Sequence, residues 1–159
     1  MTKAEVRYVA QEMILGALIN MAITLGMTWV VFHSQSEVPV WAMGGLIMDM
    51  VPSTVMPCVM MCVMLTLVTR RKLGASLAPA IPSVRLPWVV RMVPRHLVLR
   101  TGAVSVGFAV VSVALFALAF GVSDIALMAL TSVYVVKAVF AALLGAAATW
   151  VIVTKALAD

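Results

Sequence analysis

Apolar residues follow one another in four long and almost uncharged runs along this chain. The runs cover residues 13–32, 43–69, 101–121 and 125–153, with approximate ends. A helix needs about 20 residues to cross the hydrocarbon core of a membrane, which is about 30 Å thick. Backbone groups in lipid must bond to one another, and runs of this length do so as helices. The pattern predicts an all-α integral membrane four-helix bundle, built as a single transmembrane domain over residues 1–159.

The composition excludes several classes of protein. Hydrophobic residues make up 64% of the chain and charged residues 11%, against about half and about a quarter in soluble domains. A soluble enzyme, a disordered chain and a disulfide scaffold are therefore excluded. The two cysteines, Cys58 and Cys62, lie four residues apart in a predicted helix, where a disulfide is geometrically awkward.

Basic residues predict the orientation, because cytoplasmic loops retain Lys and Arg. The basic loop 70–100 holds Arg70, Arg71, Lys72, Arg85, Arg91, Arg95 and Arg100. The two short connections hold Glu37 and Asp124, and neither contains Lys or Arg. Lys3 and Arg7 precede the first span, and Lys155 follows the last. We therefore expect both termini and the long loop in the cytoplasm of a bacterial cell, with the spans in its inner membrane.

The net charge of +5 is explained by this cytoplasmic rim. It does not indicate a nucleic-acid partner, because no aromatic-studded basic face or binding motif accompanies it.

The basic loop has two parts with different patterns. Residues 75–83 are interrupted by prolines and predict an extended segment. Residues 86–96 alternate basic and apolar side chains, which suits a short helix on the cytoplasmic membrane surface. The residues expected to contact lipid headgroups are Arg85, Trp88, Arg91 and Arg95. They form either a specific site for anionic lipid or a partner protein, or an orientation signal alone.

Two ionisable residues lie inside the predicted spans, Asp49 and Lys137. Such residues are costly in a membrane, so each is a candidate functional group. Asp49 is about six residues into the second span and Lys137 about twelve into the fourth, so their depths differ by about 9 Å. A lysine side chain can extend several Å toward the surface. We predict that Asp49 and Lys137 approach each other in the interior of the bundle.

This pair has two interpretations. It lines a polar pocket that binds or relays an ion or a small solute, or it is a structural pair that fixes helix register. The polar residues expected to line such a pocket are Ser53, Thr54, Tyr134, Asn20, Thr131 and Ser132.

Two prolines, Pro52 and Pro57, lie inside the second span. Each removes a backbone donor and clashes with the preceding turn, so a kink is expected around residues 48–54. Discontinuous helices mark the sites of some transporters, although prolines also occur in ordinary membrane helices.

Sulfur-containing residues cluster in the same span. On a helix, Cys58, Met61 and Cys62 share one face, and such soft ligands suit Cu(I). Methionine and free cysteine are also ordinary packing residues. No further ligand completes a site, since His33 and His96 belong to opposite membrane faces. Packing is the favoured interpretation, and we expect no metal and no cofactor.

The two halves of the chain resemble two copies of one helical hairpin. The sequences at residues 68–70 and 153–155 are similar, being Val-Thr-Arg and Val-Thr-Lys. Each predicted hairpin crosses the membrane outward and then back. Two such copies would be related by an axis along the membrane normal, as in some transporters. Ala141, Gly145 and Thr149 form a strip of small residues, which predicts close helix packing within the bundle or between protomers.

The sequence contains no nucleophile with a base, no phosphate-binding loop and no metal triad, so an enzyme is the least supported class. Two functions remain open. One is an oligomeric channel or transporter for an ion or small solute, with its polar site at Asp49 and Lys137. The other is a non-catalytic accessory or assembly subunit of a larger membrane complex.

Overall fold

Four long helices dominate the computed structural model, which describes residues 2–82, 86–123 and 125–158. They are α1 (Lys3–Phe32), α2 (Leu46–Gly74), α4 (Leu97–Ser123) and α5 (Leu130–Ala156). The short elements are α3 (Trp88–Met92) and the strands β1 (Glu37–Pro39) and β2 (Leu127–Ala129). The four long helices are long and apolar enough to cross a membrane, which indicates a membrane protein. Arg85 and Asp124 lie outside the described residues.

Helix α1 begins at Lys3, well before the apolar run that starts near residue 13. A capping box explains this early start. The Glu5 backbone N–H donates to the Thr2 hydroxyl at 3.3 Å, and the Thr2 backbone N–H donates to the Glu5 carboxylate at 2.7 Å. These bonds satisfy donors that the first turn of a helix leaves open. Helix formation therefore extends beyond the apolar part of the sequence.

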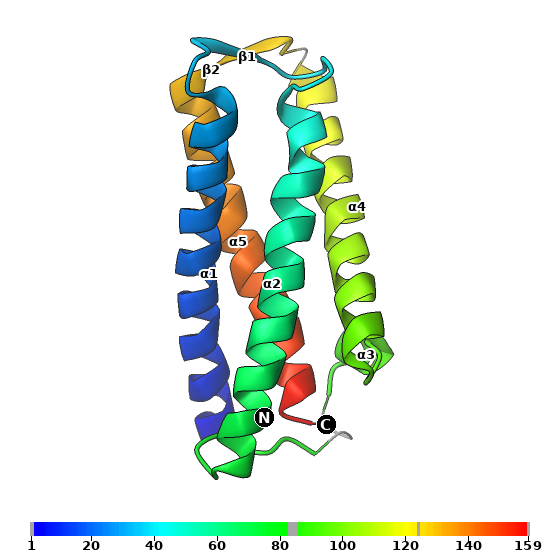
Figure 1. The fold of residues 1–159 in the computed structure, drawn as a ribbon. Coiled ribbons are helices and arrows are strands. Elements are labelled where there is room, and N and C mark those ends of the chain that lie inside the picture. The colour runs from blue at the N-terminus through cyan, green and yellow to red at the C-terminus, as the bar shows by residue number, and fades with distance from the viewer. Residues whose placement is uncertain (1, 83–85, 124, 159) are drawn as a thin grey trace.

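The strands join the two short connections at one end of the bundle, here called the strand end (Figure 1). β1 and β2 are antiparallel, with Val38 opposite Met128. The prediction that the fourth span begins at residue 125 is wrong, because β2 precedes α5. The prediction of purely helical structure missed this ladder. The backbone groups of each connection find partners in the other one, which sequence periodicity does not reveal.

Both termini, α3 and the connection between α2 and α3 lie at the opposite end, here called the terminal end (Figure 1). The loop predicted over residues 70–100 is shorter than expected, because α2 continues to Gly74 and α4 begins at Leu97. The Ile81 backbone N–H donates to the Leu157 carbonyl at 2.9 Å. This bond holds the proline-rich segment against the end of α5.

The two halves of the chain interlock. α1 packs mainly against α5 and α4 mainly against α2, while α2 and α5 cross in the centre. The two helices of each predicted hairpin, α1 with α2 and α4 with α5, contact each other little, so the predicted hairpins are not packed units. If α1 and α2 exchange places with α4 and α5, the α1–α5 pair becomes the α4–α2 pair. The packing pattern is therefore the same for both halves. An axis along the bundle, as an internal duplication requires, fits this arrangement.

The bundle exposes many large apolar side chains, and its interior holds polar side chains as well as apolar clusters. Exposed large hydrophobic residues occur on all four long helices. The buried stripe of α1, by contrast, contains Glu12, Gly16, Asn20, Thr24 and Thr28. Residues spaced by three or four positions share one helix face. The polar stripe of α1 therefore faces the other helices.

Helices α1 and α5 approach most closely at two glycines. A Cβ atom on Gly145 would lie 2.7 Å from the Gly16 carbonyl oxygen, and one on Gly16 would collide with the Thr149 hydroxyl. The small residues predicted for close packing thus lie within the bundle. The alternative, contact between protomers, does not fit their burial against α1.

We predict that Gly145→Ala lowers the free energy of unfolding by about 1–3 kcal/mol, because its methyl group would meet backbone atoms of α1. Thermal unfolding in a mild detergent measures this change. Gly26→Ala is the matched control, since a Cβ atom there meets nothing within 4 Å, and we expect a change below about 1 kcal/mol. Equal stability of the two variants would contradict the close contact.

Candidate functional site

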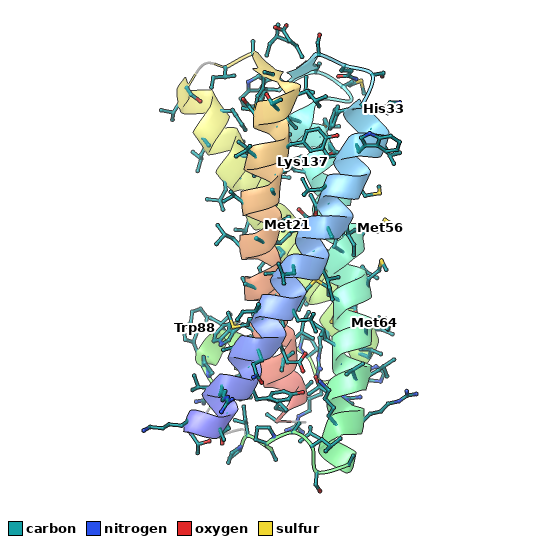
Figure 2. All side chains as sticks on the ribbon, turned by 90° about the vertical axis from the view of Figure 1, so that its left-hand side faces the viewer. Met21, His33, Met56, Met64, Trp88 and Lys137 are labelled. Atoms are coloured by element: carbon teal, nitrogen blue, oxygen red, sulfur yellow. The ribbon has the colours of Figure 1, made fainter. Side chains whose placement is uncertain are left out.

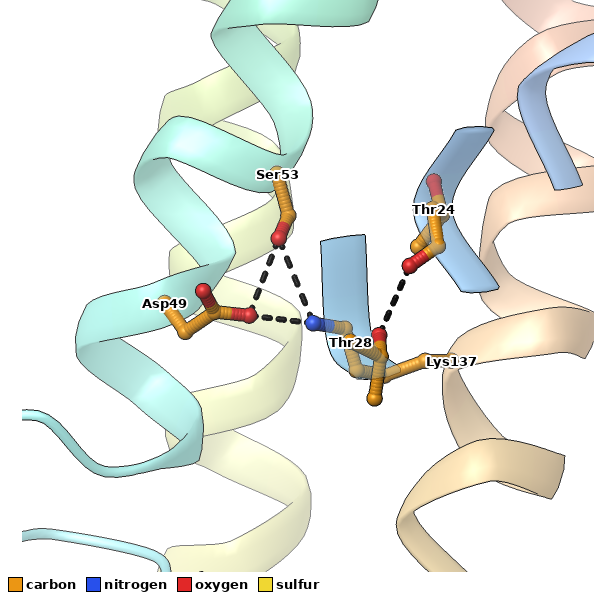
Figure 3. A network of polar contacts seen from close by, with 5 residues as sticks. All are labelled: Thr24, Thr28, Asp49, Ser53 and Lys137. Carbon is orange, nitrogen blue, oxygen red and sulfur yellow. Dashed lines mark hydrogen bonds and ion pairs between the residues drawn. The ribbon is translucent and has the colours of Figure 1, made fainter. Parts of the chain in front are cut away.

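The most distinctive polar group of the structure is an ion pair between α2 and α5. The Lys137 ammonium donates to an Asp49 carboxylate oxygen and, at 3.2 Å, to the Ser53 hydroxyl. The Ser53 hydroxyl donates to the same Asp49 oxygen at 2.9 Å. The three side chains form a closed triangle (Figure 3). As predicted, Asp49 and Lys137 meet in the bundle interior.

Helix geometry places both charges near the strand end. Asp49 lies in the first turn of α2, where the helix dipole favours a carboxylate. Lys137 lies seven residues after the start of α5 at Leu130, about 10 Å along the helix. The sequence estimate placed it deeper, because it counted residues from 125. Asp49 lies three residues after the start of α2 at Leu46, so the two residues differ in depth by about 6 Å, and the side chain of Lys137 bridges this difference.

Helix α1 completes the surroundings of the lysine. The Lys137 ammonium lies 5.6 Å from the centre of the Phe32 ring, within the range of a cation–π interaction. Thr28 and Thr24 lie one and two turns before Phe32 on the same buried face. The Thr28 hydroxyl donates to the Thr24 carbonyl at 2.7 Å (Figure 3). Three helices thus surround an ammonium group whose residue is 0% exposed.

The other predicted pocket residues are distributed differently. Thr54 is fully buried, and its hydroxyl has no partner among the described residues. Asn20 is not part of the triangle: its amide donates at 2.6 Å to the carbonyl of Ala141, one turn after Lys137 on α5. Tyr134 is half-buried and makes no hydrogen bond to the pair within the described part of the chain. Thr131 and Ser132 are exposed at the start of α5.

Sequence reasoning missed Thr24, Thr28 and Phe32. The signal was present, since Asn20, Thr24 and Thr28 recur every four residues in an apolar run. That spacing places polar groups on one helix face.

Helix α2 runs through both prolines without interruption. Pro52 is exposed and Pro57 is buried, and both lie inside Leu46–Gly74. The chain is therefore not discontinuous at this point. A bend around residues 48–54 stays a prediction.

The sulfur-containing residues belong to an apolar cluster. Cys58, Met61 and Cys62 are buried and pack against Val104 and Ile152, and both thiols are free. The described residues contain no group of three or more His, Cys, Asp and Glu side chains that could hold a metal ion. Met56 and Met64 point outward from α2 (Figure 2). This arrangement favours packing for the cysteines.

A second ion pair joins α1 and α2 at the terminal end. The Lys72 ammonium donates to the Glu12 carboxylate at 2.6 Å and lies 5.5 Å from the centre of the Tyr8 ring. The predicted headgroup residues lie at the same end. Trp88 is 72% exposed on α3 (Figure 2), Arg91 and Arg95 are exposed, and Arg85 is outside the described residues.

Comparison with known proteins gives no relative for this chain. No known protein family matches it, and neither does any curated protein or solved structure. Its function has to be inferred from its own geometry.

We predict that the two members of the Asp49–Lys137 pair differ in their effect on stability. Asp49→Asn leaves the fully buried Lys137 without its counter-charge and is expected to cost about 3 kcal/mol. Lys137→Met leaves Asp49, whose side chain is 11% exposed, so the expected cost is smaller, about 1 kcal/mol.

Thermal or denaturant unfolding of the purified protein measures both changes. The variant carrying both substitutions should be more stable than Asp49→Asn alone, because no buried charge remains unpaired. Glu37→Gln removes an exposed carboxylate at the same end and is the control. Strictly additive effects of the two substitutions would contradict direct coupling.

Proposed function

We propose that the protein is a small membrane channel or transporter for an ion or a small polar solute. The observation that carries this proposal is the polar stripe between the helices, with the Asp49–Lys137 pair near its strand end. In the proposed mechanism this pair is a gate, and its opening admits the solute to the stripe.

Unpartnered polar atoms support a hydrated interior. The buried atoms without a hydrogen-bond partner among the described residues are the hydroxyls of Tyr8, Thr24, Thr54, Ser105, Thr149 and Thr154 and the amide oxygen of Asn20. Buried polar atoms usually have partners, so a group of exceptions needs an explanation. Water or a polar solute passing between the helices would supply these partners. A helix bundle with a purely structural role does not need unpartnered polar atoms in its interior.

The position of the charges supports a gate. The Lys137 residue is 0% exposed, whereas the Asp49 side chain is 11% exposed. The carboxylate thus links the buried ammonium to the surface at the strand end. At the terminal end, the Glu12–Lys72 pair joins α1, which carries the stripe, to α2. A solute that moves along the stripe would meet an ion pair near each end.

Membrane orientation follows from the same charge distribution. Basic residues are concentrated at the terminal end, so we propose that this end faces the cytoplasm. The strand end would then face the periplasm of a bacterial cell, with the four helices in the inner membrane. Because four helices enclose little space for a path, we propose that the protein works as a homo-oligomer.

A specific surface feature favours the alternative of an accessory subunit. A groove of about 200 Å³ runs between α1 and α2, with Ile19, Met60 and Met64 among its lining residues. Flexible methionine side chains adapt to the shape of a partner. A helix of a larger membrane complex would fit against this surface.

We expect the wild-type protein, reconstituted in liposomes, to conduct at least one of four probes: protons, K⁺, Na⁺ or glycerol. Flux should rise above the wild-type level in the variant that combines Asp49→Asn with Lys137→Met, because the ion pair that closes the stripe is gone. This variant is preferred to the single ones, since it leaves no buried charge unpaired. Glu37→Gln should retain the wild-type flux. Flux that stays at the wild-type level in the combined variant would make the pair structural only.

Native mass spectrometry after mild detergent extraction from the source membrane distinguishes the two functions. A discrete homo-oligomer is expected for a channel or transporter. Co-migration with larger subunits would contradict autonomous transport and support the accessory role.

A further inference from the structure

A basic cavity of about 450 Å³ lies at the terminal end, between the α3 region and the last turn of α5. Three of its lining residues are cationic: Arg91, Arg95 and Lys155. Among the described residues, none that lines it is acidic. Arg91 is oriented by its own Nε–H, which donates to the Leu86 carbonyl at 3.0 Å. The cavity is therefore an electropositive pocket with its charges on two separate elements.

Lys155 distinguishes this cavity from an ordinary basic surface. Only 6% of the residue is exposed, and no described residue accepts a hydrogen bond from its ammonium or forms an ion pair with it. The end of a helix dipole favours a lysine at this position, but the dipole replaces only part of the lost hydration. Lys155 is thus a largely buried residue that lines a cavity beside two arginines, an arrangement suited to an anion.

An apolar groove of about 340 Å³ adjoins the cavity and shares Met92 and Val93 with it. Its remaining lining comes mostly from α4, where Ala103, Gly107 and Val111 recur every four residues. These residues lie on one face of the helix. The groove therefore follows α4 from the terminal end toward the middle of the bundle.

A basic pocket continued by an apolar groove has the chemistry of an amphiphile with an anionic head. We propose that the cavity and the groove together bind one anionic phospholipid. Its phosphate lies against Lys155, Arg91 and Arg95, and one acyl chain lies in the groove along α4. Charge-assisted hydrogen bonds from arginine and lysine are the usual means of holding a phosphate. This site is independent of the proposed gate, which lies at the other end of the bundle.

The site is tested with the full-length protein in phosphatidylcholine nanodiscs that contain increasing fractions of phosphatidylglycerol. Native mass spectrometry then counts the retained lipids. The wild type should retain one phosphatidylglycerol in preference to phosphatidylcholine. Lys155→Gln should weaken this retention by about tenfold or more, because it removes the buried charge. Lys3→Gln removes an exposed lysine of α1 at the same end and should retain the lipid as the wild type does.

Two further measurements separate a lipid from a free anion. Ala103→Phe fills the groove and should abolish retention of the phospholipid, although the basic cavity is unchanged. Inorganic phosphate, tested by thermal stabilisation of the detergent-solubilised protein, should give a smaller shift than phosphatidylglycerol, because it makes no contact in the groove.

Equal retention in the wild type and in Lys155→Gln would overturn the proposal. Strong stabilisation by phosphate, together with lipid retention that Ala103→Phe leaves unchanged, would also overturn it and leave a site for a free anion. If Lys155→Gln does not fold, Arg95→Gln is the replacement, since Arg95 is exposed, and the same loss of preference is expected.

Discussion

A polar group buried between helices is stable only where another polar group or a water molecule bonds to it, and the structure depends on this constraint. The outer surface of the bundle is apolar, so the polar side chains of α1, α2 and α5 can only meet between the helices. The Asp49–Lys137 ion pair is one such contact. Desolvation opposes the burial of each charge, and their attraction offsets it only in a well-bonded geometry. Ser53 supplies one further bond, and Phe32 covers the ammonium.

The same constraint accounts for the interlocked halves. α1 and α5 approach closely where Gly16 faces Gly145, and small residues allow such contact without loss of helical structure. Asn20 uses this proximity to reach the Ala141 carbonyl. The β1–β2 ladder then links the two halves at the strand end. Each outer helix, α1 or α4, therefore packs mainly against a helix from the other half of the chain.

Hydropathy was sufficient to predict the four long helices, because each apolar run is long enough for a membrane-spanning helix and too long for other elements. It was not sufficient for their ends. The capping box at Thr2 and the ladder at residues 127–129 depend on hydrogen bonds, which periodicity does not record. The contact of Asp49 with Lys137 could be predicted because the interior has few opposite charges. The roles of Phe32 and Lys155 could not, since a phenylalanine or a terminal lysine has no distinctive sequence pattern.

The two halves differ most clearly where their sequences are most alike. Arg70 and Lys155 end the similar segments at residues 68–70 and 153–155, yet Arg70 is exposed and Lys155 is buried. The cause is the connection that follows α2, which turns back so that Ile81 bonds to Leu157 at the end of α5. A basic residue that is part of an open rim in one half is thus, in the other half, a largely buried cation at the edge of the basic cavity.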